Sequence, residues 1–249
     1  MLSSKRVGLG ERIALVHGFT QTAETWDGIA QQLKSEFEIL AIDAPNHGDS
    51  SDISLNLESG ARSIIEVGGE ATYVGYSMGG RFCLTAAFAE PQNVKRLVLV
   101  STTAGIEDKE SRNERLKSDE ELARRVEQIG VTQFIDEWLT NSLFSGLTEE
   151  TNQRAVRLKN TAIGLSSSLR LCGAGRQQPT WTKLRELKMP VLVMAGENDS
   201  KYVELAERMV QAIGENASLQ IVKNSGHTPH LEQANVFAES IRSFIKQTS

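Results

Sequence analysis

Residues 71–81 read ATYVGYSMGGR, and this stretch decides the fold. A short apolar run, residues 71–74, leads into GYSMG (residues 75–79), and a helical pattern continues over residues 80–89. A G-x-S-x-G sequence between a strand and a helix is typical of a nucleophile elbow, in which a sharp turn holds the serine exposed above a sheet. The glycines are needed because side chains at their positions would collide in so tight a turn. The stretch therefore predicts Ser77 as a nucleophile or base.

The rest of the chain alternates short apolar runs with amphipathic helical ones. Near-continuous apolar runs indicate strands that are covered on both faces, as in parallel sheets. The predicted strands cover residues 13–16, 37–42, 71–74, 94–100, 191–195 and 218–222, with room for one short strand before residue 13. The predicted helices cover residues 24–35, 57–67, 80–89, 203–213 and 233–246. The pattern predicts an α/β fold with a mostly parallel central sheet flanked by helices.

Two further residues complete a catalytic constellation with Ser77. Asp199 follows the predicted strand 191–195, and His227 follows the predicted strand 218–222. The order Ser, Asp, His along the chain is that of the α/β-hydrolase fold. Glu197 competes with Asp199 for the role of the acid, and His230 competes with His227 for that of the base.

A second group of residues is expected to stabilise negative charge on the substrate. In this architecture the loop after the first strong strand and the residue after the nucleophile supply the N–H groups of the oxyanion hole. These positions are Phe19 and Met78.

Residues 102–183 break the alternation. This stretch contains no convincing strand, and its apolar residues recur at helical steps. We expect a helical cap, inserted before the strand that carries Asp199. The domain prediction is a core formed by residues 1–101 and 184–249, with the cap of residues 102–183 between its two parts.

Composition limits the function classes. The net charge of −5 argues against a nucleic-acid surface, and no apolar run is long enough to span a membrane. No metal-ligand spacing is seen, so we expect neither a metal nor an organic cofactor. The start of the chain lacks an apolar signal region, and its two cysteines, Cys83 and Cys172, read most simply as buried free thiols. These features predict a cytoplasmic protein of undetermined oligomeric state.

The chain resembles the 2-succinyl-6-hydroxy-2,4-cyclohexadiene-1-carboxylate synthases, α/β-hydrolase-fold lyases of menaquinone biosynthesis. The resemblance covers nearly the whole chain. Residues 17–20, 43–50 and 75–81 are shared in outline with many hydrolases, whereas Arg81, Trp138 and the segments 115–119 and 173–181 are more specific. Residues 196–202 and 226–227 closely resemble the triad segments of the family. It implies a substrate with several carboxylates and therefore several cations in the pocket.

By this resemblance the substrate-binding residues are Arg81, Arg115, Tyr76, Trp138 and Lys159. Lys159 stands where the family usually has arginine, and Arg176 is the alternative third cation. Two interpretations stay open: Arg81 could instead form a salt bridge inside the core, and Trp138 could be a core residue of the cap.

The resemblance implies a lyase reaction that expels pyruvate, with Ser77 acting as a base through His227 rather than as a nucleophile. Two alternatives remain, because one fold hosts many functions. They are a hydrolase of small esters, enol-lactones or carbon–carbon bonds, and a non-catalytic ligand-binding protein.

Overall fold

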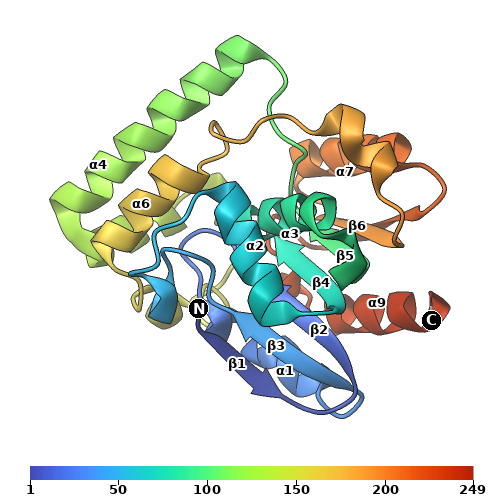
Figure 1. The fold of residues 1–249 in the computed structure, drawn as a ribbon. Helices are drawn as coiled ribbons and strands as arrows, with labels where there is room; N and C mark the ends of the chain where they lie inside the picture. Colours follow the sequence, from blue (N-terminus) through green and yellow to red (C-terminus); the bar gives the residue numbers. More distant parts are fainter. Residues whose placement is uncertain (249) are drawn as a thin grey trace.

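The computed structural model describes residues 1–248, and its centre is a seven-stranded sheet (Figure 1). The strand order is β1-β3-β2-β4-β5-β6-β7, and all neighbours are parallel except β1 against β3. The strands are β1 Ser4–Val7, β2 Glu11–Val16, β3 Phe37–Ile42, β4 Ala71–Tyr76, β5 Val94–Val100, β6 Val191–Gly196 and β7 Ala217–Val222. The predicted mostly parallel sheet is confirmed, and so is the single short strand before residue 13.

Helices cover both faces of this sheet because side chains alternate across each strand. One hydrophobic cluster joins a sheet face to α2 (Leu57–Gly68), α3 (Met78–Ala89) and α7 (Ser200–Ile213). A second cluster joins the opposite face to α1 (Asp27–Leu33) and α9 (Ala234–Gln247). Short elements connect these helices and strands: η1 Ala23–Trp26, η2 Gly48–Ser50, η3 Pro91–Asn93 and α8 Pro229–Glu232.

The predicted helix 24–35 is divided. Its first part is the 3₁₀ turn η1, and regular α-helix begins only at Asp27. The Trp26 ring is fully buried between His230, at a centroid distance of 4.7 Å, and Phe237, at 6.0 Å. The change from 3₁₀ to α-helix occurs where this ring packs against distant residues. Such contacts cannot be predicted from local periodicity.

Between β5 and β6 the chain contains helices only. They are α4 (Lys109–Leu139), η4 (Ser142–Phe144), α5 (Arg154–Arg157), α6 (Ala162–Cys172) and η5 (Trp181–Glu186). In Figure 1, α4 and α6 lie together, to one side of the sheet. We keep the name cap for residues 102–183.

The long helix α4 is kinked at Gly130, which has a φ of 76°. Apolar residues from both sides of this point, Val126, Phe134 and Ile135, meet Leu165 of α6 in a small core. The cap therefore has packing of its own in addition to its contacts with the sheet.

Cys83 and Cys172 are buried free thiols, as the sequence indicated. Among residues 1–248, no helix is both long enough and apolar enough to cross a membrane.

Candidate active site

Ser77 lies in a strained turn between β4 and α3. Its φ of 51° is unusual for a residue with a side chain. The Ser77 N–H donates to the Val100 carbonyl at 2.8 Å, and Thr102 Oγ1 donates to the Ser77 carbonyl at 2.7 Å. A Cβ on Gly79 would lie 2.1 Å from the Val16 carbonyl oxygen, so only glycine lets α3 pack this closely on β2. These contacts hold the serine side chain above the sheet.

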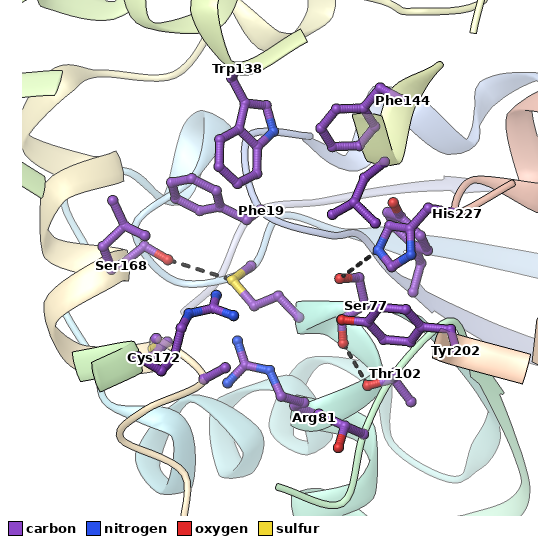
Figure 2. A pocket seen from close by; sticks show the side chains of 18 residues that line it. Phe19, Ser77, Arg81, Thr102, Trp138, Phe144, Ser168, Cys172, Tyr202 and His227 are labelled. Atoms are coloured by element: carbon purple, nitrogen blue, oxygen red, sulfur yellow. Dashed lines mark hydrogen bonds between the residues drawn. The ribbon is translucent and has the colours of Figure 1, made fainter. Parts of the chain in front are cut away.

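The three residues of the predicted triad lie together. His227 Nδ1 is 2.6 Å from Asp199 Oδ2. His227 Nε2 is 3.4 Å from Ser77 Oγ, a contact that Figure 2 shows. With Nδ1–H donating to the carboxylate, Nε2 is left to accept the serine proton. Both contacts are within hydrogen-bond distance, as proton transfer from the serine hydroxyl to the imidazole requires. This geometry can make Ser77 either a base or a nucleophile.

The competing acid and base are occupied elsewhere. Glu197 accepts the N–H of Asn224 at 3.1 Å, on the exposed side of its loop. His230 Nε2 lies 3.3 Å from Gln21 Nε2, and its ring packs against Tyr76 with centroids 4.3 Å apart. Burial lowers the pKa of His230 well below its ordinary value, so it remains neutral.

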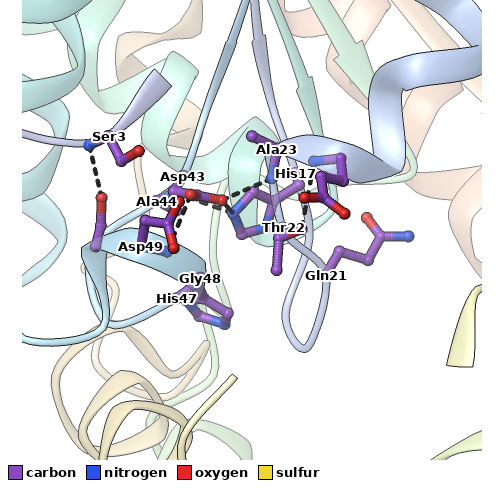
Figure 3. A network of polar contacts seen from close by, with 12 residues as sticks. Ser3, His17, Gln21, Thr22, Ala23, Asp43, Ala44, His47, Gly48 and Asp49 are labelled. Atoms are coloured by element: carbon purple, nitrogen blue, oxygen red, sulfur yellow. Dashed lines mark hydrogen bonds and ion pairs between the residues drawn. The ribbon is translucent and has the colours of Figure 1, made fainter. Parts of the chain in front are cut away.

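His17 and His47 hold the loop after β2 that carries Phe19, here called the oxyanion loop, in place (Figure 3). His17 Nε2 accepts the Ala44 N–H at 3.0 Å, and its Nδ1 donates to the Gly18 carbonyl at 2.8 Å. Asp43, directly after β3, accepts the Ala23 N–H at 2.7 Å and so holds the far end of this loop. The loop is therefore fixed on both sides of Phe19.

Phe19 and Met78 both line the pocket above Ser77. Met78 is the first residue of α3, and the first N–H groups of a helix have no partner inside it. Their positions suit the predicted role of the two residues in an oxyanion hole.

One pocket is lined by Ser77 and His227. Its walls come from the elbow, the cap, helix α7 and the loops after β2, β5 and β7 (Figure 2). Most of the predicted site residues line it: Phe19, Tyr76, Ser77, Met78, Arg81, Arg115, Trp138 and His227.

Arg81 is the most unusual residue of this pocket. Its side chain is buried, and its Nη1 has no hydrogen-bond partner. Burial lowers the pKa of its guanidinium. Asp119, a buried carboxylate nearby, is instead bonded to Arg115 Nε at 2.7 Å. The interpretation of Arg81 as half of a core salt bridge is therefore not supported by the contacts.

Tyr76 and Trp138 both line the pocket. Trp138 stacks on Phe134 at 6.1 Å and meets Phe19 edge-on at 5.2 Å. It therefore belongs both to the cap core and to the pocket, so the two interpretations left open by the sequence are compatible. Its Nε1 is buried without a partner.

The structure does not place Lys159 in the pocket. Its Nζ bonds to Glu24 Oε2 at 2.5 Å, and more than half of its side chain is exposed. Arg176 is also exposed and lies outside the pocket, with Nε donating to the Arg170 carbonyl at 3.0 Å. Family spacing pointed to Lys159, but the end of α5 turns that side chain outward.

Two residues near the site were missed in the sequence. Arg157, two positions before Lys159, is buried, donates to Thr20 Oγ1 and has an unpartnered Nη2. Burial lowers its pKa to about 10, so it is still charged at neutral pH. Tyr202 packs on His227 with ring centroids 4.5 Å apart and lines the pocket. No local signal distinguishes Arg157 from a surface arginine, because its burial depends on how the cap meets the core.

Among residues 1–248, no cluster of three or more His, Cys, Asp or Glu side chains is arranged to hold a metal ion.

Known proteins of similar sequence share this architecture. The pattern of the alpha/beta hydrolase family matches residues 13–240. A putative 2-succinyl-6-hydroxy-2,4-cyclohexadiene-1-carboxylate synthase of Bacillus subtilis is 31% identical, over 94% of this chain and 90% of its own length. The chain belongs to this synthase family, within the α/β hydrolases.

Other members of the synthase family support this placement. The synthase of Yersinia pestis (strain Nepal516) is 25% identical over 96% of this chain and 89% of its own. The structure of MenH from S. aureus superposes with a TM-score of 0.91, at 27% identity, and covers 98% of both chains. A Thermogutta terrifontis esterase superposes with a TM-score of 0.86 at 23% identity, a likeness that extends to the fold alone. The chain is thus an enzyme of α/β-hydrolase fold from a menaquinone-pathway family.

Proposed function

We propose that this enzyme eliminates pyruvate from 2-succinyl-5-enolpyruvyl-6-hydroxy-3-cyclohexene-1-carboxylate to give 2-succinyl-6-hydroxy-2,4-cyclohexadiene-1-carboxylate. The observation that carries the proposal is the buried, partly unpartnered guanidinium of Arg81, one helical turn beyond Ser77. A buried cation without a counter-ion is costly, and a carboxylate ligand offsets that cost. A pocket for neutral esters has no use for it.

The cations divide between the core and the cap. Arg81 comes from α3, and Arg115 reaches the pocket from α4, where Asp119 holds its guanidinium. We assign the third cation to Arg157, in place of Lys159. Arg157 does not line the pocket itself, but it is buried against Thr20 with one nitrogen free, and its guanidinium lies over the ring of Phe144, which does line the pocket. Three positive groups match a substrate with a succinyl carboxylate, a ring carboxylate and a carboxylate on the leaving group.

The triad then acts by proton transfer. His227, oriented by Asp199, accepts the Ser77 proton while the Ser77 oxygen removes a proton from the ring carbon. The electron pair of that carbon–hydrogen bond shifts through the conjugated system and expels the enolpyruvyl oxygen, which leaves as pyruvate after protonation. The N–H groups of Phe19 and Met78 stabilise the enolate-like oxygen on the succinyl carbonyl. No water is consumed.

The decisive experiment measures pyruvate release from the enolpyruvyl substrate by the purified protein, with a chromogenic ester as the comparison. We expect stoichiometric pyruvate and diene formation, and slow ester hydrolysis at most. A stoichiometric mass adduct on Ser77 during turnover of the natural substrate would contradict the mechanism and favour a hydrolase.

A further inference from the structure

One carboxylate holds the backbone on both sides of His227. Glu232, the last residue of α8, accepts the Gly226 N–H on Oε2 at 2.7 Å. Its Oε1 accepts the Thr228 N–H at 2.9 Å and the Thr228 hydroxyl at 2.7 Å. Gly226 and Thr228 are the two neighbours of His227 in the chain. The peptide groups that flank the base are thus bonded to a single side chain.

We propose that Glu232 is a positioning residue for His227, a role that rests on the triad of the proposed function. Hydrogen bonds from N–H groups to a carboxylate are roughly twice as strong as neutral ones, so this pair fixes the loop firmly. His227 needs such support because its ring must meet Asp199 and Ser77 at the same time. A shift of about 1 Å in a catalytic group can cost on the order of 100-fold in rate.

Helix capping accounts for only part of the arrangement. The bond from the Thr228 N–H to Glu232 resembles a capping box, although Glu232 lies one position beyond the usual partner, and α8 starts directly after Thr228. The bond from Gly226 has no place in such a cap, because Gly226 lies before His227 and outside α8. The Glu232 carboxylate therefore also bonds to the residue before His227. This second bond is the one that restricts the position of His227.

The cap closes this arrangement from the other side. A Cβ on Gly146, in the segment after η4, would lie 2.1 Å from Glu232 Oε2 and 2.8 Å from its Cδ. The cap backbone at Gly146 therefore packs directly against the carboxylate, and a side chain added there would displace it. Through this contact, the segment after η4 and the loop that carries His227 are linked.

Two variants perturb the carboxylate from different directions. Glu232→Gln keeps its size but replaces one acceptor oxygen with a donor, and Gly146→Ala pushes the carboxylate from the cap side without altering it. We expect each to lower kcat for pyruvate release by about 10- to 100-fold while KM stays within about threefold, since the substrate cations are untouched. The controls are Glu239→Gln, on an exposed α9 carboxylate, and Gly28→Ala, where an added Cβ has no atom within 4 Å.

The double variant tests whether both changes act through one group. If Gly146 acts by displacing Glu232, adding Gly146→Ala to Glu232→Ala causes little further loss of kcat, and the two effects are strongly non-additive. Full additivity, or a kcat within threefold of wild type for both single variants, overturns the proposal. A lower melting temperature with unchanged kcat also overturns it, since a purely structural role predicts that result.

A readout that needs no turnover separates this inference from the proposed function. The proton shared by His227 and Asp199 is expected to give a downfield resonance in the proton NMR spectrum, which Glu232→Gln and Gly146→Ala weaken or shift and both controls retain. If the wild-type protein released no pyruvate, the proposed function would fail, yet the resonance would still decide whether Glu232 positions the base. An unchanged resonance in both variants contradicts the positioning role.

Discussion

Arg81 shows what a single buried charge implies about a ligand. Its helix is central and buried, so most side chains there pack against apolar neighbours. A guanidinium in that setting is stabilised by a bound anion, and its planar fork suits a carboxylate. Arg157 Nη2 is also buried without a partner, so a bound carboxylate would stabilise this guanidinium as well.

Replacing Arg81 separates a binding role from a structural one. We expect Arg81→Met to lower kcat/KM for pyruvate release by roughly 2–4 kcal/mol, partly through KM, because a buried charge pair loses one member. Arg81→Lys should also be poor, since an ammonium cannot form the bidentate contact. Steady-state kinetics and thermal unfolding on each variant check this. Arg176→Met is the matched control, because Arg176 is exposed and lies outside the pocket. It should leave both kcat/KM and the melting temperature unchanged. Normal kinetics with a lower melting temperature for Arg81→Met would return this residue to a structural role.

The catalytic residues should behave as one unit. Ser77→Ala and His227→Ala are each expected to lower kcat by several orders of magnitude, because each removes one end of the same proton transfer. The double variant should be little worse than either single one. Kinetics of pyruvate release give the rates, and circular dichroism checks that each variant is folded. Near-wild-type turnover by Ser77→Ala would refute the mechanism.

At the scale of elements, the cap and the core meet at aromatic contacts. Phe134 of α4 is buried in the cap core and meets Phe19 of the oxyanion loop edge-on at 6.4 Å. A change in cap packing therefore reaches the oxyanion loop directly. The kink at Gly130 lies between Val126 and Phe134, which both contribute to the cap core.

Truncating Phe134 tests that coupling. Phe134→Ala removes packing worth about 3–5 kcal/mol in a well-packed core, and it frees one side of Phe19. We expect faster hydrogen exchange in α4 and α6 and a loss of kcat/KM beyond any loss of global stability. Ile163→Ala is the control, because Ile163 lies on the same cap with its side chain 77% exposed. If Phe134→Ala and Ile163→Ala had the same kcat/KM and the same hydrogen-exchange rates in α4 and α6, the cap would not support the oxyanion loop.

At the scale of the whole molecule, buried neutral histidines link folding to pH. Burial lowers the pKa of His17 to about 4 and that of His47 to about 3, against an ordinary value of 6.5. Below pH 6.5 the unfolded chain binds protons at these positions and the folded chain does not. Folding stability therefore falls as the pH drops from about 6.5 toward 4.

Urea unfolding between pH 7.5 and 4.5 measures this effect. We expect a steady decrease of the unfolding free energy below pH 6.5, at about 1.4 kcal/mol for each pH unit and each histidine that differs in protonation. Surface carboxylates with lowered pKa values, such as Glu38 beside Arg12, contribute mainly below pH 4.5, so the two ranges are separable. A flat profile between pH 7.5 and 5 would show that these histidines are not neutral in the folded protein.

Local sequence determined the strands, the elbow and the order of the triad. The apolar runs and the glycines of the elbow act over a few residues, so periodicity and turn chemistry are enough to read them. The positions of Ser77, Asp199 and His227 follow because the ends of parallel strands meet at one edge of a sheet. Resemblance to a family added Arg81 and Arg115, which sit beside well-marked motifs.

Only the tertiary structure decided which other groups reach the site. Lys159 and Arg157 are two residues apart in the cap, yet one faces solvent and the other is buried against Thr20. Glu232 bonds to the neighbours of His227 in the chain. Gly146, more than eighty positions before Glu232 in the sequence, packs against the Glu232 carboxylate. Such contacts depend on how distant segments pack, and packing direction leaves no trace in local composition. The sequence was therefore enough to predict the catalytic residues and their chemistry. The residues that position the base and the third buried cation could be identified only from the folded structure.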